Sequence, residues 1–420
     1  MAVGNGPLYD LICAQSQNDR QRSPSVPRIS QRVELIKPSA TIVVSARAMA
    51  LKAAGKDIIS LGFGEPDFDT PDHIKQAAIA AIESGKTKYT EVDGTPELKA
   101  AIIGKLKRDN ELDYRPEQIL VSNGAKQSLF NLLTALLNPD DEVIVPAPYW
   151  VSYPDMVKLV GAEPAVINGQ PDNDYKITAR ELANTLNEQT RLLIINSPSN
   201  PTGKVYRAEE YAALGEVLQE FPKVSIACDD IYEHIYWGDE PFATLLNACP
   251  ELAERTVIVN GVSKAYAMTG WRIGYAAGPE DIIKAMIKVQ GQSTSCASSI
   301  SQAAATAALN GPQDCVEEMR QAFEARYRYF RGALNEIPGV DCPACDGAFY
   351  AFPSFQGVLE ARPDLSSDVD LANWLLEEAG VSTVPGSAFG APGHLRLSYA
   401  ASREYLEDAV GRIRKAVSKG

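Results

Sequence analysis

The chain has 420 residues, of which 45% are hydrophobic and 22% are charged, proportions that are typical of a folded globular protein. Its formal net charge of −14 argues against a broad basic face for nucleic acid or anionic lipid. No apolar run approaches the ~20 residues that a membrane-spanning helix needs. We therefore predict a cytoplasmic protein whose partners include neither nucleic acid nor a membrane.

The first 32 residues are rich in Gln, Ser, Pro and Arg and lack an apolar signal region. This composition predicts a mobile N-terminal arm. Import into an organelle is the alternative, and Asp10 and Asp19 argue against it because transit peptides avoid acidic residues.

Residues 71–310 alternate between amphipathic helical patterns and short runs that are rich in β-forming residues. The helices are expected over residues 74–82, 97–106, 129–137 and 208–218, and the strands begin at Glu142, Arg191, Val224 and Thr256. Strands that are apolar on both faces and alternate with helices indicate a mostly parallel sheet covered on both sides. We predict a large α/β domain over these residues.

The pattern changes near residue 311. A long charged helix, "CVEEMRQAFEARYRYFRGAL", is followed by "GAFYAF", by a helix near residues 371–378 and by "GHLRLSYA". Mixed elements of this kind predict a smaller α+β domain over residues 311–420, completed by residues 33–70 from the other end of the chain.

Polar residues follow each apolar strand of the large domain. The sequence places Trp150, Asn200, Asp229 and Lys264 just after four of the predicted strands. Open sheets of this type bind ligands beyond the carboxyl ends of their strands, so these side chains are expected to converge on one crevice.

Several familiar signatures do not occur in the sequence. "GFGEPD" from Gly62 lacks the third glycine of a dinucleotide fingerprint, and there is no phosphate-binding G-x-x-x-x-G-K-[ST] loop. Cys342 and Cys345 form a single C-x-x-C with no second pair, and the three histidines are scattered. We predict no metal site.

What remains is a lysine, Lys264, an acid, Asp229, and a tyrosine, Tyr232, at strand ends. A desolvated lysine can form a Schiff base, an aspartate can keep a pyridinium nitrogen protonated, and a tyrosine hydroxyl can bond a ring oxygen. These are the requirements of pyridoxal 5′-phosphate. Taken one at a time, the same residues would be read as surface charge, a loop cap and a core aromatic.

The phosphate of such a cofactor needs backbone N–H groups at a helix start. The stretch "SNGAKQSLFNLL" supplies Ser122 or Asn123 as the expected cap, followed by Gly124 and an amphipathic helix. Ser263 and Arg272 would add a hydroxyl and a bidentate cation.

From about residue 33 to the C-terminus, the ordered motifs resemble one family. These motifs are "FGEPDFDTP", "TKYTEVDGTPELK", "SNGAKQ", "APYWVSYPDM", "SPSNPTG", "DDIYEH", "SKAYAMTGWRIGY", "GAFY" and "LRLSYA". The chain is similar to the class I aminotransferases, which have pyridoxal-phosphate fold type I. Within that family it resembles the prokaryotic-type aspartate aminotransferases, including bifunctional aspartate and prephenate aminotransferases.

The resemblance implies a role for each matching residue. Lys264 would carry the cofactor as a Schiff base, Asp229 would contact the ring nitrogen, and Tyr232 and Asn200 would contact the ring oxygen. Trp150 would stack on the ring and border the substrate. The residues implied at the phosphate are Gly124, Ala125, Ser263 and Arg272, and Lys126 is also expected to contact the cofactor. Tyr89 would reach the phosphate of the neighbouring subunit, which implies a homodimer with shared active sites.

The resemblance also implies the substrate contacts. Arg396 would take the α-carboxylate, helped by Gly64 and Asn200. A distal carboxylate needs a second cation, and Lys126 at a helix start is the candidate. In the resembling bifunctional enzymes a lysine and a threonine that match Lys126 and Thr41 help to accept prephenate.

We therefore expect ping-pong transamination between aspartate or glutamate and 2-oxoglutarate or oxaloacetate, with prephenate as a further acceptor. The alternatives are an aromatic or alanine specificity, or a carbon–sulfur lyase of the same fold. A non-catalytic ligand sensor is a third, for which we would expect an added nucleic-acid-binding domain or loss of the lysine.

Overall fold

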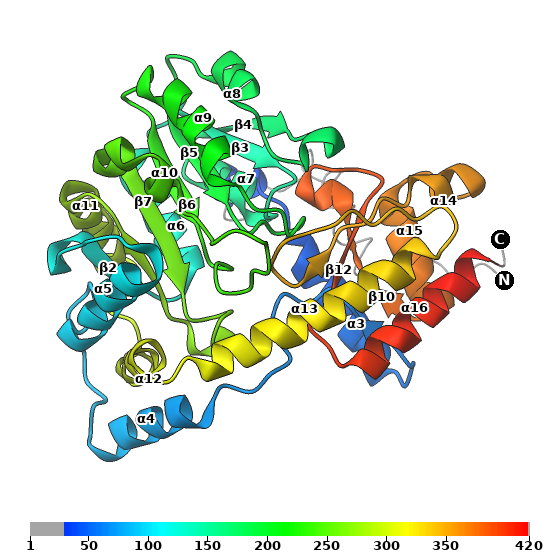
Figure 1. Ribbon diagram of the computed structural model, residues 1–420, viewed down its shortest axis with the longest axis horizontal. Coiled ribbons are helices and arrows are strands. Elements are labelled where there is room, and N and C mark those ends of the chain that lie inside the picture. The colour runs from blue at the N-terminus through cyan, green and yellow to red at the C-terminus, as the bar shows by residue number, and fades with distance from the viewer. Residues whose placement is uncertain (1–28, 419–420) are drawn as a thin grey trace, which may run out of the picture.

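The computed structural model describes residues 29–418 of the chain (Figure 1). The predicted mobile arm, residues 1–32, lies almost wholly outside the described residues. Helix α2 (Gln31–Glu34) crosses the predicted boundary at residue 32 and lies against α7 (Ser152–Leu159).

A seven-stranded sheet organises the larger part of the molecule. Its strand order is β2-β8-β7-β6-β5-β3-β4, and only β8 runs antiparallel to its neighbours. The strands are β2 (Ile119–Ser122), β3 (Glu142–Ala147), β4 (Glu163–Asn168), β5 (Thr190–Asn196), β6 (Ser225–Asp229), β7 (Thr256–Gly261) and β8 (Gly274–Ala277). The four strands expected from the sequence are β3, β5, β6 and β7, which are contiguous in the sheet. The predicted mostly parallel α/β architecture is confirmed.

Both faces of the sheet are buried, as β5 shows. Leu192 and Ile194 belong to the core under α6 (Ala125–Leu136) and α7. Leu193 and Ile195 belong to the core on the other face, under α8 (Ala179–Thr185) and α9 (Ala208–Gln219). Side chains alternate between the faces of a strand, so a strand covered on both sides must be apolar throughout.

Nine helices of the described chain accompany the sheet. They are α4 (Asp72–Glu83), α5 (Pro96–Asn110), α6 (Ala125–Leu136), α7 (Ser152–Leu159), α8 (Ala179–Thr185), α9 (Ala208–Gln219), α10 (Leu245–Ala248), α11 (Glu280–Gly291) and α12 (Ser299–Asn310). The four predicted helices correspond to α4, α5, α6 and α9.

The smaller part of the molecule joins the two ends of the chain. Its elements are α3 (Ala40–Ala53), β1 (Ile59–Ser60), α13 (Asp314–Asn335), β9 (Tyr350–Ala351), α14 (Gln356–Ala361), α15 (Asp368–Trp374), β10 (Val381–Ser382), β11 (Val384–Pro385), β12 (Leu395–Ser398) and α16 (Arg403–Val417). Strands β11, β12 and β9 form an antiparallel sheet, and β1 pairs in parallel with β10. The domain boundaries at residues 70 and 311 stay a prediction, and the β1–β10 pairing is the observation that favours them.

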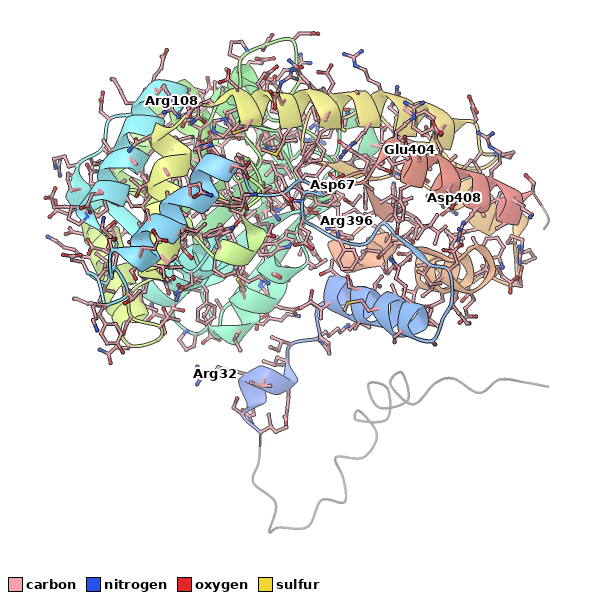
Figure 2. All side chains as sticks on the ribbon, turned by 90° about the horizontal axis from the view of Figure 1, so that it is seen from below. Arg32, Asp67, Arg108, Arg396, Glu404 and Asp408 are labelled. Atoms are coloured by element: carbon pink, nitrogen blue, oxygen red, sulfur yellow. The ribbon has the colours of Figure 1, made fainter. Side chains whose placement is uncertain are left out.

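The helix expected near residues 371–378 is α15, which continues into a short π-helix over Leu375–Ala379. The long charged helix is α13, which runs from the large sheet to the smaller part (Figure 1). In Figure 2, Arg396 lies inside the molecule, between α3 below and α13 above. Within residues 29–418, no helix is both long and apolar enough to cross a membrane.

Candidate active site

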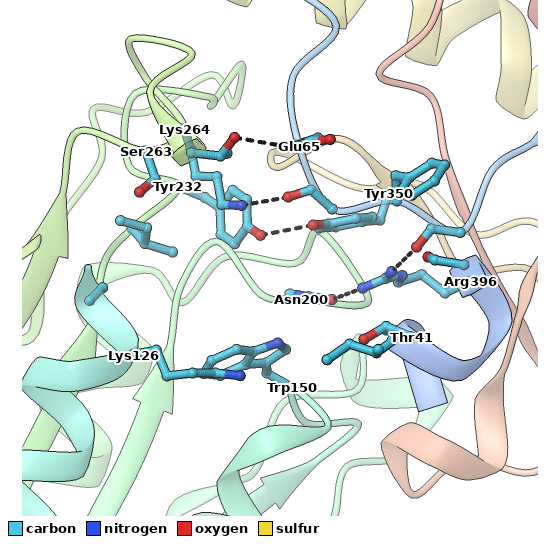
Figure 3. Close-up of a pocket in the computed structure, with 18 of the residues that line it drawn as sticks. Thr41, Glu65, Lys126, Trp150, Asn200, Tyr232, Ser263, Lys264, Tyr350 and Arg396 are labelled. Atoms are coloured by element: carbon cyan, nitrogen blue, oxygen red, sulfur yellow. Dashed lines mark hydrogen bonds between the residues drawn. The ribbon is translucent and has the colours of Figure 1, made fainter. Parts of the chain in front are cut away.

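A pocket of about 570 Å³ opens where the strand ends of the large sheet face the smaller part of the molecule. It brings together most of the residues predicted from the sequence, and its lining includes Thr41, Gly64, Ala125, Lys126, Trp150, Asn200, Asp229, Tyr232, Ser263, Lys264, Arg272 and Arg396. Figure 3 shows Tyr232 and Lys264 facing Tyr350 and Arg396 across this pocket. The predicted crevice beyond the carboxyl ends of the strands is therefore present.

Lys264 is half-buried in the loop that follows β7. Its Nζ donates a hydrogen bond to the carbonyl oxygen of Gly64 at 2.5 Å. Burial, helped by the positive charge of Arg396, lowers the pKa of Lys264 to about 8. A lysine with this pKa is partly neutral near physiological pH, which is the form that attacks a carbonyl carbon or accepts a proton.

Asp229 ends β6 and is buried beneath the pocket. One carboxylate oxygen, Oδ2, accepts a hydrogen bond from the hydroxyl of Tyr153 at 2.6 Å. The other, Oδ1, is buried and has no hydrogen-bond partner among residues 29–418. Burial raises the pKa of Asp229 to about 6, and the bond from Tyr153 acts in the opposite direction. A buried carboxylate oxygen without a partner fits a protonated ring nitrogen, which would supply the missing donor.

The start of α6 lies at one end of the pocket beside Arg272. The helix begins at Ala125 with Gly124 as its N-cap, and no side chain caps its first N–H groups. The expectation that Ser122 or Asn123 caps the helix is wrong, because Ser122 ends β2 and is paired with Gly274. Gly124 has a φ of +88°, and a Cβ there would collide with the guanidinium of Arg272. An uncapped helix start beside a cation fits a phosphate group.

Arg396 lies on β12 and is only 2% exposed. Its Nη1 donates to Oδ1 of Asn200 at 3.0 Å and its Nη2 to the carbonyl oxygen of Gly62 at 2.8 Å. Its Nε is buried without a partner among the described residues. A buried guanidinium with no carboxylate beside it is suited to bind a carboxylate that enters from solution.

Lys126 occupies the first turn of α6, and its Nζ stands 4.7 Å from the centre of the Trp150 ring. Burial lowers its pKa, and the positive charge of Arg272 adds to this effect. Within residues 29–418 it forms no ion pair with a carboxylate. Thr41, at the start of α3, also borders the pocket (Figure 3).

Tyr89 stands apart from the other predicted residues. It lies between α4 and α5, is 91% exposed and does not line the pocket of its own chain. Two lining residues, Tyr153 and Tyr350, received no role from the sequence, although both occur in quoted motifs. In the described chain, no group of three or more His, Cys, Asp or Glu residues is arranged to hold a metal ion.

The chain is similar to known aminotransferases both in sequence and in structure. The family model "Aminotransferase class I and II" matches residues 56–413. An aspartate/prephenate aminotransferase of Nitrosomonas europaea is 53% identical over 93% of this chain and 100% of its own length. An aspartate aminotransferase of Bacillus subtilis is 48% identical over 93% of this chain and 99% of its own. The crystal structure of the aspartate aminotransferase from Rhizobium meliloti superimposes with a TM-score of 0.89, at 47% identity over 94% of this chain and 99% of that chain.

Proposed function

Because the chain belongs to the class I and II aminotransferase family, we propose that it exchanges an amino group between aspartate or glutamate and a 2-oxo acid. The acceptors are 2-oxoglutarate and oxaloacetate, and we propose prephenate as a further acceptor. The observation that carries the proposal is one pocket holding a lysine of lowered pKa, a buried aspartate, an uncapped helix start and a buried arginine.

The cofactor that these residues fit is pyridoxal phosphate, which supplies an electron sink for charge that develops at the substrate α-carbon. Oδ1 of Asp229 would hold its ring nitrogen, and Tyr232 and Asn200 its ring oxygen. Gly124, Ala125, Ser263 and Arg272 would hold its phosphate, with Lys126 close by.

The substrate would enter against Arg396, whose guanidinium binds the α-carboxylate and so fixes the α-carbon near Lys264. Nζ of Lys264 would act as the base that takes the α-proton from the substrate. Trp150 would cover one face of the ring and limit access of water.

A screen of amino donors and 2-oxo acceptors on the purified holoenzyme tests this function. Transamination leaves pyridoxamine phosphate on the enzyme when a donor is added alone, whereas a carbon–sulfur lyase regenerates pyridoxal phosphate. Prephenate turnover would be measured in the same screen, and its absence would leave a plain aspartate aminotransferase. A different preferred donor would instead favour an aromatic or alanine specificity.

Lys126 is proposed to bind the distal carboxylate of the substrate, with Thr41 beside it. Lys126→Ala is expected to lower kcat/KM for aspartate and glutamate by ~10- to 100-fold, because a charged hydrogen bond to a carboxylate is lost. Alanine and phenylalanine have no distal carboxylate, so their kcat/KM should change much less. The measurement is kcat/KM for all four donors.

Lys284→Ala is the control, because Lys284 is an exposed lysine on α11 that pairs with Glu280. It should leave all four values unchanged. An equal loss on all four donors in Lys126→Ala would place Lys126 at the cofactor, where its contact with Trp150 would explain the loss.

Uptake of the cofactor should depend on pH through Lys264. Only the neutral amine attacks the aldehyde, and a folded-state pKa of about 8 means that the neutral fraction rises as the pH passes through 8. Adding pyridoxal phosphate to cofactor-free protein should therefore give an uptake rate that rises through about pH 8 and then levels off. A midpoint near the ordinary value of 10.5 would show that burial does not perturb this amine.

We also propose a homodimer in which Tyr89 reaches the phosphate of the neighbouring subunit. Its high exposure in the single chain, away from its own pocket, is compatible with such a role. The cytoplasmic location stays a prediction.

A further inference from the structure

Tyr350 lies between Tyr232, which comes from the large-sheet side of the pocket, and Arg396, which comes from β12 on the other side. It is 1% exposed and belongs to β9, where it pairs with Ser398 of β12, the strand that carries Arg396. Its hydroxyl oxygen stands 2.9 Å from that of Tyr232, which follows β6 of the large sheet (Figure 3). The contact joins residues that are 118 positions apart in the sequence.

The ring of Tyr350 contacts Arg396. The guanidinium carbon of Arg396 stands 4.4 Å from the centre of the Tyr350 ring, and both side chains are buried. A cation over a ring face is attracted most strongly where water is excluded. The ring therefore helps to hold the guanidinium that is proposed to bind the substrate α-carboxylate.

The hydroxyl of Tyr350 also lies close to Gly64. A Cβ on Gly64 would stand 2.9 Å from that hydroxyl oxygen, so a larger residue there would displace it. The carbonyl oxygen of the same glycine accepts the bond from Lys264. Tyr350 thus contacts or borders three of the proposed site residues: Tyr232, Arg396 and Gly64.

The direction of the bond between the two tyrosines follows from counting protons. Each hydroxyl has a single hydrogen. If Tyr232 donates its hydrogen to the ring oxygen of the cofactor, it has none left for Tyr350. Tyr350 must then be the donor and Tyr232 the acceptor. Hydrogen bonds in such a chain polarise and strengthen one another.

We infer that Tyr350 is a positioning residue: its hydroxyl donates to Tyr232 and so aims the Tyr232 proton at the ring oxygen, while its ring holds Arg396. This inference rests on the proposed function, because the ring oxygen belongs to pyridoxal phosphate. It assigns the hydroxyl and the ring of one side chain to two separate tasks, and two substitutions separate them.

Tyr350→Phe removes the hydroxyl and keeps the ring. A hydrogen bond from Tyr232 to the ring oxygen stabilises the deprotonated form of the bound cofactor and so lowers its pKa. This pKa is measured from the change in cofactor absorbance with pH. That pKa should rise in Tyr350→Phe without any substrate present, and kcat/KM for aspartate should fall by ~3- to 10-fold. Binding of succinate, an unreactive dicarboxylate, should change little.

Tyr350→Leu removes the ring as well. It should show the same rise in the cofactor pKa and, in addition, weaker binding of succinate, because Arg396 loses the ring beneath it. Tyr327→Phe is the control, since Tyr327 is buried in the same core and accepts a bond from the Cys345 backbone at 2.7 Å but does not line the pocket. Tyr327→Phe should change neither the pKa of the bound cofactor nor the binding of succinate.

The outcomes separate this inference from the function on which it rests. The positioning role is wrong if the unmodified protein binds pyridoxal phosphate and transaminates, but the bound cofactor has the same pKa in Tyr350→Phe as in the unmodified protein. If the unmodified protein does neither, the proposed function itself fails. Should Tyr350→Leu not fold, the titration of Tyr350→Phe still decides the role of the hydroxyl.

Discussion

Replacing Lys264 by alanine is expected to lower transamination by ~10⁴-fold or more, because one amine would both carry the cofactor and transfer the substrate proton. The geometry favours this double role. Lys264 is the lysine in the pocket whose pKa burial brings to about 8, and its Nζ already lies near Arg396, Asp229 and the Gly64 carbonyl. The other lysine of the described lining, Lys126, is not expected to substitute, because its Nζ stands over the ring of Trp150.

The measurement combines activity with a chemical label. Borohydride reduction of the yellow holoenzyme, followed by peptide mapping, should place the cofactor on Lys264. In Lys264→Ala the cofactor should bind without a covalent bond, held by the helix start and Arg272. Lys284→Ala, an exposed lysine, is the control and should label and turn over normally. A label on any other lysine would overturn the assignment.

The central strands could be predicted because their surroundings leave a clear pattern. Leu192 to Ile195 is apolar at every position, as a strand covered on both faces requires. Strands β8 and β4 lack this pattern for physical reasons. β8 reads Gly-Tyr-Ala-Ala and has no β-branched residue, so pairing with β2 and β7 fixes it rather than propensity. β4 contains Pro164, which has no backbone N–H to donate to a neighbouring strand, and β4 is the edge strand at the end of the order.

In the candidate site, too, features set by the local sequence could be predicted, whereas features set by contacts between distant segments could not. The strand ends that carry Asp229 and Lys264 could be predicted, because the carboxyl ends of parallel strands share one edge. The local sequence predicts the wrong helix cap because Ser122 resembles a cap residue, and only the sheet reveals its pairing with Gly274. The hydroxyl contacts of Tyr153 with Asp229 and of Tyr350 with Tyr232 join distant segments, and no local pattern signals them.

Asp229→Ala should lower kcat by ~10²- to 10³-fold and change KM far less. Its carboxylate would stabilise charge on the cofactor ring, and that charge grows mainly in the transition state. An interaction made mostly in the transition state appears in kcat rather than in KM. The fold should survive: the substitution relieves a buried carboxylate whose pKa burial raises to about 6, although it leaves the Tyr153 hydroxyl without its acceptor.

The neighbouring carboxylate provides a matched control. Asp230 is 1% exposed, and burial, with the nearby charge of Glu233, raises its pKa well above the ordinary value. Asp230→Asn replaces the carboxyl group by an amide of the same size at a position that does not line the pocket. It should keep kcat within a few-fold of the unmodified enzyme, whereas Asp229→Asn should lose activity nearly as Asp229→Ala does. Thermal unfolding of each variant would show that the fold is intact. A near-normal kcat in Asp229→Asn would mean that charge at this position does not support the ring, and a different group would have to be sought for that role.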